Sequence, residues 1–138
     1  MAGLFNLEGK VALLTGASKG MGKAMAEGLA EHGARVVISS RKQDQCDAVA
    51  AEINAAHGAG TATPIACNTG YKEQLQALVD QTHAQVGTID ILVGNAGVNP
   101  FYGPMSEIPD SAFDKIMSSN VKSNHWLCQM VAPDMIAQ

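Results

Sequence analysis

The sequence predicts a doubly wound α/β fold with one parallel sheet, in a single domain over residues 1–138. Three observations support this class: four short apolar runs, helix-like segments between them, and a glycine-rich turn directly after the first run. Each connection is long enough for a right-handed helical crossover, so we expect parallel strands in the Rossmann-type spatial order 3-2-1-4. The chain ends at Gln138 before a fifth run, and we expect a sheet truncated before its fifth strand.

The first unit combines the apolar run Lys10–Leu14 with a helix expected over Met21–Ala30. Apolar residues in the second segment recur at the three-and-four spacing of one helix face. The pair therefore predicts a strand and the helix that crosses over to the next strand. The residues that mark the apolar face of this helix are Met21, Ala24, Met25, Gly28 and Leu29.

The second and third units repeat the pattern. The run Arg35–Ile38 precedes a helix that should end near Gly58 and Gly60. The run Ala62–Cys67 precedes a helix that Gly87 should stop. The residues spaced to form the buried faces of these helices are Cys46, Val49, Ala50 and Ile53 in the first, and Leu75, Leu78, Val79, Thr82 and Val86 in the second.

The fourth run is Ile89–Val93, followed by the Gly- and Pro-rich loop Gly94–Pro109 and a last helix. With no strand after it, we expect this run to be an exposed apolar edge that promotes pairing with another chain. The residues that mark the apolar stripe of the last helix are Phe113, Ile116, Met117, Val121, Leu127, Cys128 and Val131.

The turn after the first run has the spacing of a phosphate-binding loop. Gly16 allows the sharp exit from the strand, Gly20 lets the backbone approach a ligand, and Gly22 lets the helix lie close to the sheet. Free N–H groups at the start of that helix then point at a diphosphate. An ordinary tight turn is the alternative, but a preceding strand and a following helix favour a dinucleotide site. The predicted binding residues of the turn are Thr15, Gly16, Ser18, Lys19, Gly20, Met21 and Gly22.

The second run ends in Ser39-Ser40-Arg41-Lys42, where a site for NAD usually has an acid. No carboxylate here repels a 2′-phosphate, the hydroxyls can donate to it, and Arg41 offers a planar charged fork. Lys19 can approach the same phosphate from the turn. Arg41 and Lys42 could instead only solvate a helix start, although cations are unfavourable there without an anion. We therefore predict NADP(H) as the cofactor in preference to NAD(H), with Ser39, Ser40 and Arg41 in its site.

Two further segments, Cys67–Thr69 and Gly94–Gly97, follow the third and fourth runs. Ligands of doubly wound sheets bind outside the carboxyl ends of the strands, at the point where the strand order reverses. We therefore expect these segments to lie around the same crevice as the glycine turn.

Three motifs stand in order along the chain: Thr15-Gly16-x-x-x-Gly20-x-Gly22, then Asn95-Ala96-Gly97, then Asn120 within Ser119-Asn120-Val121. Together they resemble the short-chain dehydrogenase/reductase family, and the resemblance covers the whole chain. Ser39–Lys42 and Val98–Pro104 further resemble its NADP-preferring carbonyl and retinal reductase branch.

The resemblance implies a role for each of these residues. Lys19, Ser40 and Arg41 would bind the 2′-phosphate. The other implied contacts, which support the sheet and line the cofactor's ribose, are Asn95, Ala96 and Gly97.

Two positions depart from the family pattern. Where the family has an acid for the adenine amino group, this chain has Asn68, followed by Thr69. The oxygen of Asn68 can accept the same hydrogen bond more weakly, so we keep both residues in the predicted cofactor site. Where the family has two asparagines before Ala-Gly, this chain has Gly94-Asn95. We expect a looser strand end there, with cofactor binding retained.

Asn120 lies on the apolar stripe of the last helix, four residues after Ile116 and seven before Leu127. A buried amide must find hydrogen-bond partners, so it either bridges backbone groups or holds ordered water. The resemblance implies the second role, a catalytic one, in which the amide binds a water of the proton relay. An asparagine that kinks the helix or caps its backbone is the alternative.

The family's reaction also needs a Ser that polarises the substrate oxygen, and a Tyr whose pKa is lowered by a Lys four residues later. The two tyrosines, Tyr71 and Tyr102, are followed at that spacing by Leu75 and Ser106. The chain therefore looks like the amino-terminal part, inactive alone, of an enzyme that interconverts a carbonyl and an alcohol of a small molecule. A non-catalytic nucleotide-binding half-domain or regulatory module is the alternative.

Composition argues against several other classes. The formal net charge is −4 without a basic cluster, so we expect no nucleic-acid partner. No apolar stretch approaches the roughly 18 residues of a membrane span, and the first nine residues lack a signal-peptide pattern. We therefore expect a cytoplasmic protein, with the lumen of an organelle as the alternative. Cys46, Cys67 and Cys128 share no ligand spacing with the histidines, so we expect neither metal nor disulfide. We expect the full-length form to be a homo-oligomer, a dimer or tetramer.

Overall fold

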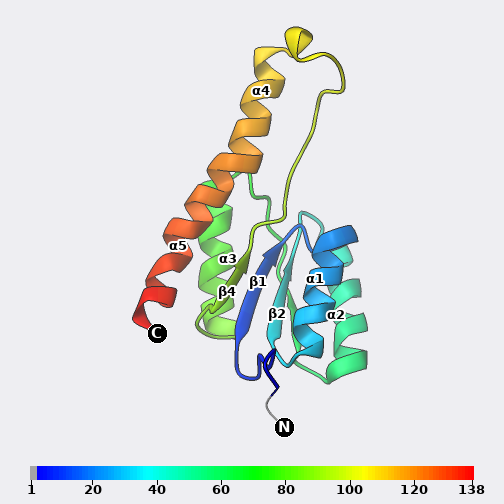
Figure 1. The fold of residues 1–138 in the computed structure, drawn as a ribbon, viewed down its shortest axis with the longest axis vertical. Helices are drawn as coiled ribbons and strands as arrows, with labels where there is room; N and C mark the ends of the chain where they lie inside the picture. The colour runs from blue at the N-terminus through cyan, green and yellow to red at the C-terminus, as the bar shows by residue number, and fades with distance from the viewer. Residues whose placement is uncertain (1–2) are drawn as a thin grey trace.

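Four parallel strands form the central sheet, in the spatial order β3-β2-β1-β4 (Figure 1). The computed structural model describes residues 3–138, so Met1 and Ala2, the start of the segment expected to lack a signal peptide, lie outside the described residues. The predicted doubly wound class and strand order are confirmed. The strands are β1 over Val11–Thr15, β2 over Arg35–Ser39, β3 over Ala62–Pro64 and β4 over Ile91–Val93.

Helices cover both faces of this sheet (Figure 1). On one face lie α1, over Gly20–Glu31, and α2, over Gln43–His57. On the other face lie α3, over Lys72–Gln85, and α5, over Ser123–Ala137. Every helix within residues 3–138 is too short or too polar to cross a bilayer.

The connection after β4 and the first part of the last helix extend beyond the carboxyl ends of the strands (Figure 1). After β4 the chain extends away from the sheet, over residues 94–104, to a short 3-10 turn, η1, at Met105–Glu107. It returns as α4 over Asp110–Ile116, a wider π-helical segment, η2, over Met117–Lys122, and then α5. Figure 1 shows α4 standing clear of the sheet, whereas α5 runs back alongside α3.

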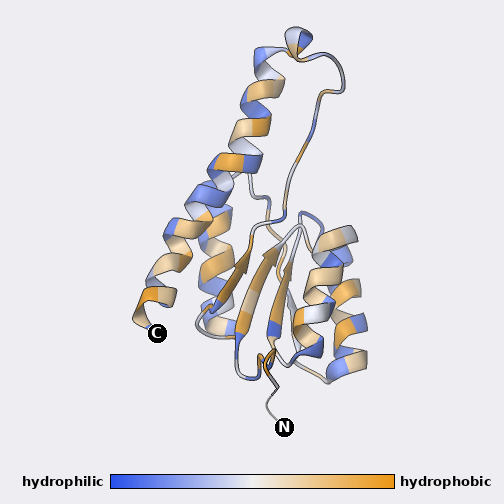
Figure 2. Cartoon of the chain, viewed as in Figure 1, coloured by the Kyte–Doolittle hydropathy of each residue, from blue (hydrophilic) through white to orange (hydrophobic). Residues whose placement is uncertain are grey.

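Alternate residues of β1 enter two separate apolar clusters. Ala12 and Leu14 face α1 and α2, whereas Val11 and Leu13 face α3 and α5. This follows from the alternation of side chains along a strand, and it explains why β1 reads as an unbroken apolar run. Figure 2 shows the same feature as hydrophobic colouring along the strands.

The apolar face predicted for α1 was wrong in its orientation. The residues that face the sheet are the small ones, Gly22, Ala26 and Ala30, whereas Met21 is 76% exposed and Met25 is also exposed. The reason is distance: small side chains let α1 lie close to the sheet, and a methionine would hold it away. The spacing of large apolar residues therefore indicated the helix but not its buried side.

The apolar stripe predicted for the last helix was correct only over α5. Leu127 and Val131 are fully buried there. The wider π turn at Met117–Lys122 shifts the phase of the side chains, and α4 has no layer to pack against (Figure 1). The residues of the predicted stripe that are exposed are Phe113, Met117, Val121 and Cys128.

Both short strands differ slightly from their predicted runs. β3 ends at Pro64 instead of Cys67, although the Cys67 N–H still donates to the Ser40 carbonyl at 2.9 Å. β4 begins at Ile91 rather than Ile89 and forms one edge of the sheet, as expected. Just before it, the Asp90 carboxylate accepts a hydrogen bond from the Val11 N–H at 2.8 Å.

Asp134, near the end of α5, contacts both the backbone just before β4 and a side chain of α3. Its Oδ2 atom accepts a hydrogen bond from the Ile89 N–H at 3.0 Å and lies 2.6 Å from Nε2 of His83 on α3. Burial by itself raises the pKa of this carboxyl, but the Ile89 hydrogen bond and the His83 interaction outweigh burial. The pKa of Asp134 therefore lies below its ordinary value of 3.8.

Replacing Asp134 with alanine is expected to lower the free energy of unfolding by about 1 kcal/mol at neutral pH, because the Ile89 N–H loses its acceptor. A carboxyl with a lowered folded-state pKa stabilises the fold fully above its unfolded-state pKa, and this stabilisation is lost as the pH falls through the folded-state pKa. The difference between wild type and variant should therefore shrink in the acid range. Urea unfolding over a pH series measures it, and a difference independent of pH would contradict the assignment.

Candidate functional site

The glycine turn lies at the carboxyl end of β1 and leads directly into α1 (Figure 1). Gly16 and Gly20 have φ angles of 61° and 57°, a backbone region that favours glycine. No side chain of the described residues caps the start of α1 at Lys19. The N–H groups of the first turn are therefore free to donate to an anion.

Gly22 is packed against the turn itself. A Cβ atom at this position would lie 2.8 Å from the carbonyl carbon of Gly16, 2.7 Å from Nδ2 of Asn95, and closer still to the Gly16 oxygen. A Cβ atom at Gly16 would lie 2.9 Å from the Ala96 nitrogen. Only glycine fits both positions, so the turn, the start of α1 and the Asn95-Ala96 segment can pack closely together.

Three hydrogen bonds connect the end of β1 and the glycine turn to the segment that follows β4. Nδ2 of Asn95 donates to the Gly16 carbonyl at 3.0 Å. Oγ1 of Thr15 accepts from the N–H groups of Asn95 and Ala96 at 3.1 and 3.2 Å. The structure therefore brings together the glycine turn and the Asn95-Ala96-Gly97 segment, both of which belong to the predicted cofactor site.

The end of β2 lies beside this turn. The Ala17 N–H donates to the Ser39 carbonyl at 3.0 Å. The Ser39 side chain is buried, and its Oγ atom has no hydrogen-bond partner within residues 3–138. Oγ of the next residue, Ser40, lies 3.2 Å from Sγ of Cys46. A buried hydroxyl without a partner is rare, so this strand end fits a ligand that brings a polar group.

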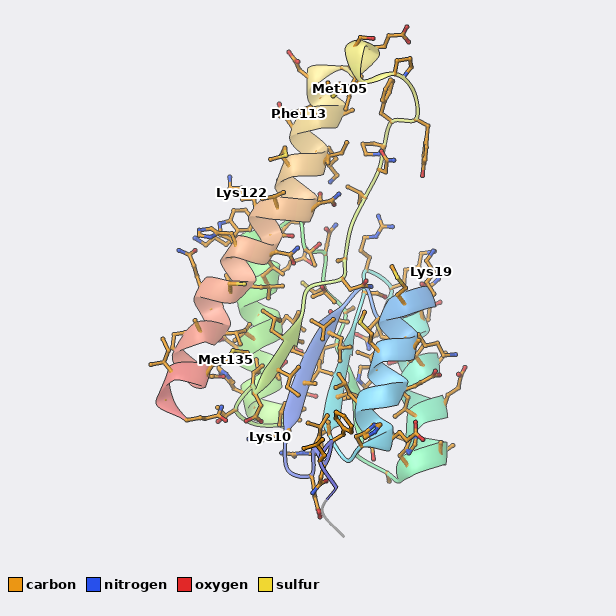
Figure 3. The ribbon with its side chains drawn as sticks, in the orientation of Figure 1. Lys10, Lys19, Met105, Phe113, Lys122 and Met135 are labelled. Atoms are coloured by element: carbon orange, nitrogen blue, oxygen red, sulfur yellow. The ribbon has the colours of Figure 1, made fainter. Side chains whose placement is uncertain are left out.

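Two cations of the predicted site are free. Lys19 and Arg41 are both exposed, and neither forms an ion pair within the part of the chain that the structure describes. Figure 3 shows Lys19 at the end of α1 that lies next to the carboxyl ends of the strands, whereas Lys10 lies at the opposite end of β1. The positive charge is therefore available to an anion on the side of the glycine turn.

Asn68 lies after β3, in the loop that leads to α3. Its Oδ1 atom accepts from the Gly70 N–H at 3.0 Å, and its own N–H donates to Oε1 of Gln74 at 2.8 Å. An amide oxygen accepts two hydrogen bonds, so one acceptor position remains for a ligand. Its neighbour Thr69 is half-buried. Burial raises the pKa of the adjacent Cys67 thiol to about 11, which keeps this group neutral at physiological pH.

Asn120 lies in the π-helical segment and bridges backbone groups. Its Oδ1 atom accepts from the Val98 N–H at 2.8 Å, and its Nδ2 donates to the Val98 carbonyl at 2.9 Å. This is the first of the two roles that its sequence position allowed. π-helical turns are frequently found at functional sites, and this one turns Asn120 toward the chain just after Gly97.

Sequence reasoning missed Asn124, which lies beside the end of β4. Its amide occupies the space next to Gly94, and its Nδ2 donates to the Asn120 carbonyl at 2.9 Å. The expected loosening of this strand end is therefore wrong, because Asn124 fills the position. The signal that could have indicated it is an asparagine four residues after Asn120, combined with a glycine at the strand end.

Other predicted features lie apart from this region. Tyr102, in the segment between β4 and η1, is 87% exposed, and Tyr71 lies at the start of α3. A cavity of about 630 Å³ lies at the opposite end of the sheet, around Phe5, Glu31 and His32. It is remote from the glycine turn, so it is a separate feature.

Comparisons with known proteins agree with this geometry. The family described as short chain dehydrogenase matches residues 10–138. "Dehydrogenase/reductase SDR family member 4" of Bos taurus is 40% identical over 130 residues, which are 94% of this chain and 46% of that protein. The protein of the same name in Caenorhabditis elegans is 40% identical over 126 residues, 91% of this chain and 48% of that protein. This chain thus spans about half the length of these relatives.

Solved structures give the same result. L-Sorbose reductase from Gluconobacter frateurii, complexed with NADPH and L-sorbose, matches 99% of this chain and 51% of its own, with a TM-score of 0.90 and 30% identity. A metagenomic short-chain oxidoreductase in complex with NADP matches 95% of this chain and 58% of its own, with a TM-score of 0.86 and 39% identity. The glycine turn, the sheet order and these matches agree: the chain belongs to the short-chain dehydrogenase family of oxidoreductases.

Proposed function

We propose that this chain is the NADP(H)-binding part of an oxidoreductase of the carbonyl or retinal reductase branch, which interconverts a carbonyl and an alcohol on a small molecule. The observation that carries the proposal is the glycine turn at the end of β1, next to a strand end with hydroxyls and cations but no acid. The NADPH and NADP complexes of two similar proteins support it. When bound, the nicotinamide supplies or accepts the hydride, and the protein provides orientation and proton handling.

The backbone of the glycine turn would hold the pyrophosphate. The uncapped amides at the start of α1 can donate to it, and Ser18 and Met21 belong to the same turn. Within residues 3–138, and apart from its chain neighbours and the backbone of its own helix, no atom lies within 4 Å of the position that a Cβ atom at Gly20 would take. A ligand therefore has room to approach the backbone there.

The 2′-phosphate would lie between the glycine turn and the end of β2. Lys19 and Arg41 are exposed and unpaired within the described residues, and the Ser40 hydroxyl lies between β2 and α2. Arginine binds phosphate through two parallel hydrogen bonds, and lysine binds it as a point charge. This set of donors favours NADP(H) over NAD(H).

The adenosine part would contact the ends of the other strands. Asn68 keeps one acceptor position for the adenine amino group, and Thr69 lies next to it. The Ser39 hydroxyl, which has no hydrogen-bond partner among the described residues, fits a polar group of the ligand. The ribose would be lined by Asn95, Ala96 and Gly97.

Asn120 is the member of the catalytic set that this chain contains. Both hydrogen-bonding groups of its side chain are engaged by Val98. These two bonds hold the segment that leaves the cofactor site, and the amide's second acceptor position and second N–H would serve to bind the water of the proton relay that the family resemblance implies.

Titration of the chain with NADPH and NADH, followed by nucleotide fluorescence, tests the proposal. We expect saturable binding with NADPH at least about tenfold tighter, because a hydrogen bond to a charged group is worth roughly 1.5–3 kcal/mol. Equal affinities would overturn the assignment of NADP(H). Absence of binding by both nucleotides would overturn the proposed function.

The second candidate is a non-catalytic nucleotide-binding half-domain or regulatory module. It is favoured by one observation, that neither tyrosine of these 138 residues has a lysine four positions later. Oxidation of NADPH over a panel of ketones, by a longer form of the protein that contains Tyr-x-x-x-Lys, distinguishes the two. Turnover supports the oxidoreductase, and nucleotide binding without turnover of any ketone supports the module.

An exposed apolar stripe on α4 and η2 suggests how copies of the protein associate. Phe113, Met117 and Val121 follow one another at a spacing of four residues, and Phe113 and Val121 are 53% and 54% exposed. Figure 3 shows Phe113 on α4, well away from the sheet. A groove of about 520 Å³ lies alongside, lined by Met117, Val121 and His125 among others. We infer that a second copy of the chain covers this stripe in a homo-oligomer.

Replacing Val121 with lysine is expected to convert the oligomer to a monomer, because a buried unpaired charge costs several kcal/mol. Light scattering coupled to size exclusion measures the change. Tyr102→Lys, at an exposed position between β4 and η1, serves as the control and should leave the mass of the oligomer unchanged. A monomeric wild type, or an oligomer that survives Val121→Lys, would contradict the inference.

A further inference from the structure

At the end of β4, a side chain from α5 fills the space that a side chain at Gly94 would otherwise occupy. A Cβ atom at Gly94 would lie 3.1 Å from Cγ of Asn124 and closer still to its Oδ1 atom. The φ angle of Gly94 is not positive, so glycine is needed here for space and not for conformation. The amide of Asn124, on α5, therefore occupies the place that a side chain at position 94 would fill.

The direction of this amide is fixed by a second contact. Nδ2 of Asn124 donates to the Asn120 carbonyl at 2.9 Å, which leaves Oδ1 facing Gly94. The accepting carbonyl belongs to the π-helical segment, where the regular pattern of backbone hydrogen bonds changes. Asn124 thus packs on Gly94 at the end of β4 and donates a hydrogen bond to the π-helical segment η2.

Asn120 holds the other end of the same segment. Its side chain makes two hydrogen bonds to Val98, and a Cβ atom at Gly97 would lie 3.5 Å from its Oδ1 atom. Asn124 therefore contacts the chain at Gly94, and Asn120 bonds to it at Val98. The residues between these two points are Asn95, Ala96 and Gly97 of the cofactor site.

We propose that Asn124 is a positioning residue for this segment, and that Gly94 is the residue whose missing side chain makes room for it. The inference rests on the proposed binding of NADP(H). Through its packing on Gly94 and its hydrogen bond to Asn120, the Asn124 amide sets the position of Asn95, whose Nδ2 holds the Gly16 carbonyl. Loss of this packing moves the strand end relative to the glycine turn.

A double-mutant cycle of Gly94→Ala and Asn124→Ala tests the proposal. The methyl group of Gly94→Ala collides with the Asn124 amide, so this variant should bind NADPH about tenfold more weakly. Asn124→Ala removes the amide and should weaken binding by about threefold. In the double variant the added methyl group meets free space, so its affinity should equal that of Asn124→Ala.

The dissociation constant for NADPH and the fluorescence of the bound nicotinamide are measured at a temperature where each variant is folded, with thermal unfolding recorded in parallel. Gly28→Ala, at a glycine with no atom near its added Cβ, is the control. If Gly94→Ala does not fold, recovery of folding and binding in the double variant supports the same coupling.

Three outcomes would overturn the inference. If Gly94→Ala has the same effect with and without the Asn124 amide, the two residues are not coupled. If the unfolding temperature changes while the affinity and nicotinamide fluorescence do not, the pair is only structural. If the wild type itself fails to bind NADPH, the proposed function fails, and this inference fails with it.

Discussion

Replacement of Gly22 with alanine is expected to weaken NADPH binding strongly and to destabilise the fold. The added Cβ atom would lie 2.8 Å from the backbone of Gly16 and 2.7 Å from Nδ2 of Asn95, and neither can move without opening the turn. Overpacking of this kind costs about 3 kcal/mol of unfolding free energy. Since the same contact shapes the pyrophosphate site, affinity for the nucleotide should fall by at least about tenfold in molecules that remain folded.

Gly28→Ala provides a matched control, because it is the same substitution in the same helix. Among the described residues, and apart from its chain neighbours and the backbone of its own helix, no atom lies within 4 Å of the Cβ atom added at Gly28, so this variant should be as stable as wild type or slightly more stable. Thermal unfolding and NADPH titration of both variants measure the contrast. If Gly22→Ala behaves like Gly28→Ala, the close approach of α1 to the turn has no role in the site.

Replacement of Arg41 with aspartate is expected to remove the preference for NADPH. The substitution deletes a charged fork and places a carboxylate where the 2′-phosphate is expected. We expect affinity for NADPH to fall by about a hundredfold, the combined effect of the lost charged hydrogen bonds and the new repulsion. Affinity for NADH should be unchanged or higher, because a carboxylate at this position can accept from the ribose hydroxyls.

Arg35→Asp is the control for Arg41→Asp, because it makes the same change of charge at the opposite end of β2. Parallel titrations of wild type and both variants with NADPH and NADH measure the result. An NADPH affinity that falls equally in both variants would indicate a general effect of net charge. Unchanged NADPH affinity in Arg41→Asp would remove Arg41 from the site.

The sequence predicted the fold well where local chemistry decides the structure. The apolar runs around Leu13 and Val37 gave two buried parallel strands, and the glycines at 16, 20 and 22 gave the turn between strand and helix. The lengths of the crossovers indicated parallel strands, and the order 3-2-1-4 followed from the fold class that the glycine turn indicates. These features depend on residues close together in the chain, so a single sequence is sufficient to predict them.

Other features depend on contacts between distant segments. The buried side of α1 was missed because Ala26 and Ala30 are needed for close packing on the sheet, whereas the larger Met21 and Met25 lie outside. The stripe of the last helix was missed because a single wide turn shifts its phase. The Asn124 amide lies beside Gly94, thirty positions away in the sequence, and the contact could have been indicated only by combining the Asn120–Asn124 spacing with the glycine at the distant strand end.

A crystal structure of the chain with NADPH tests the central claim most directly. We predict that the pyrophosphate lies against the backbone between Gly16 and Gly22, and that the 2′-phosphate lies within hydrogen-bond distance of Ser40, Arg41 or Lys19. Nucleotide bound elsewhere on the chain, or a glycine turn closed by the protein's own side chains at saturating NADPH, would contradict it.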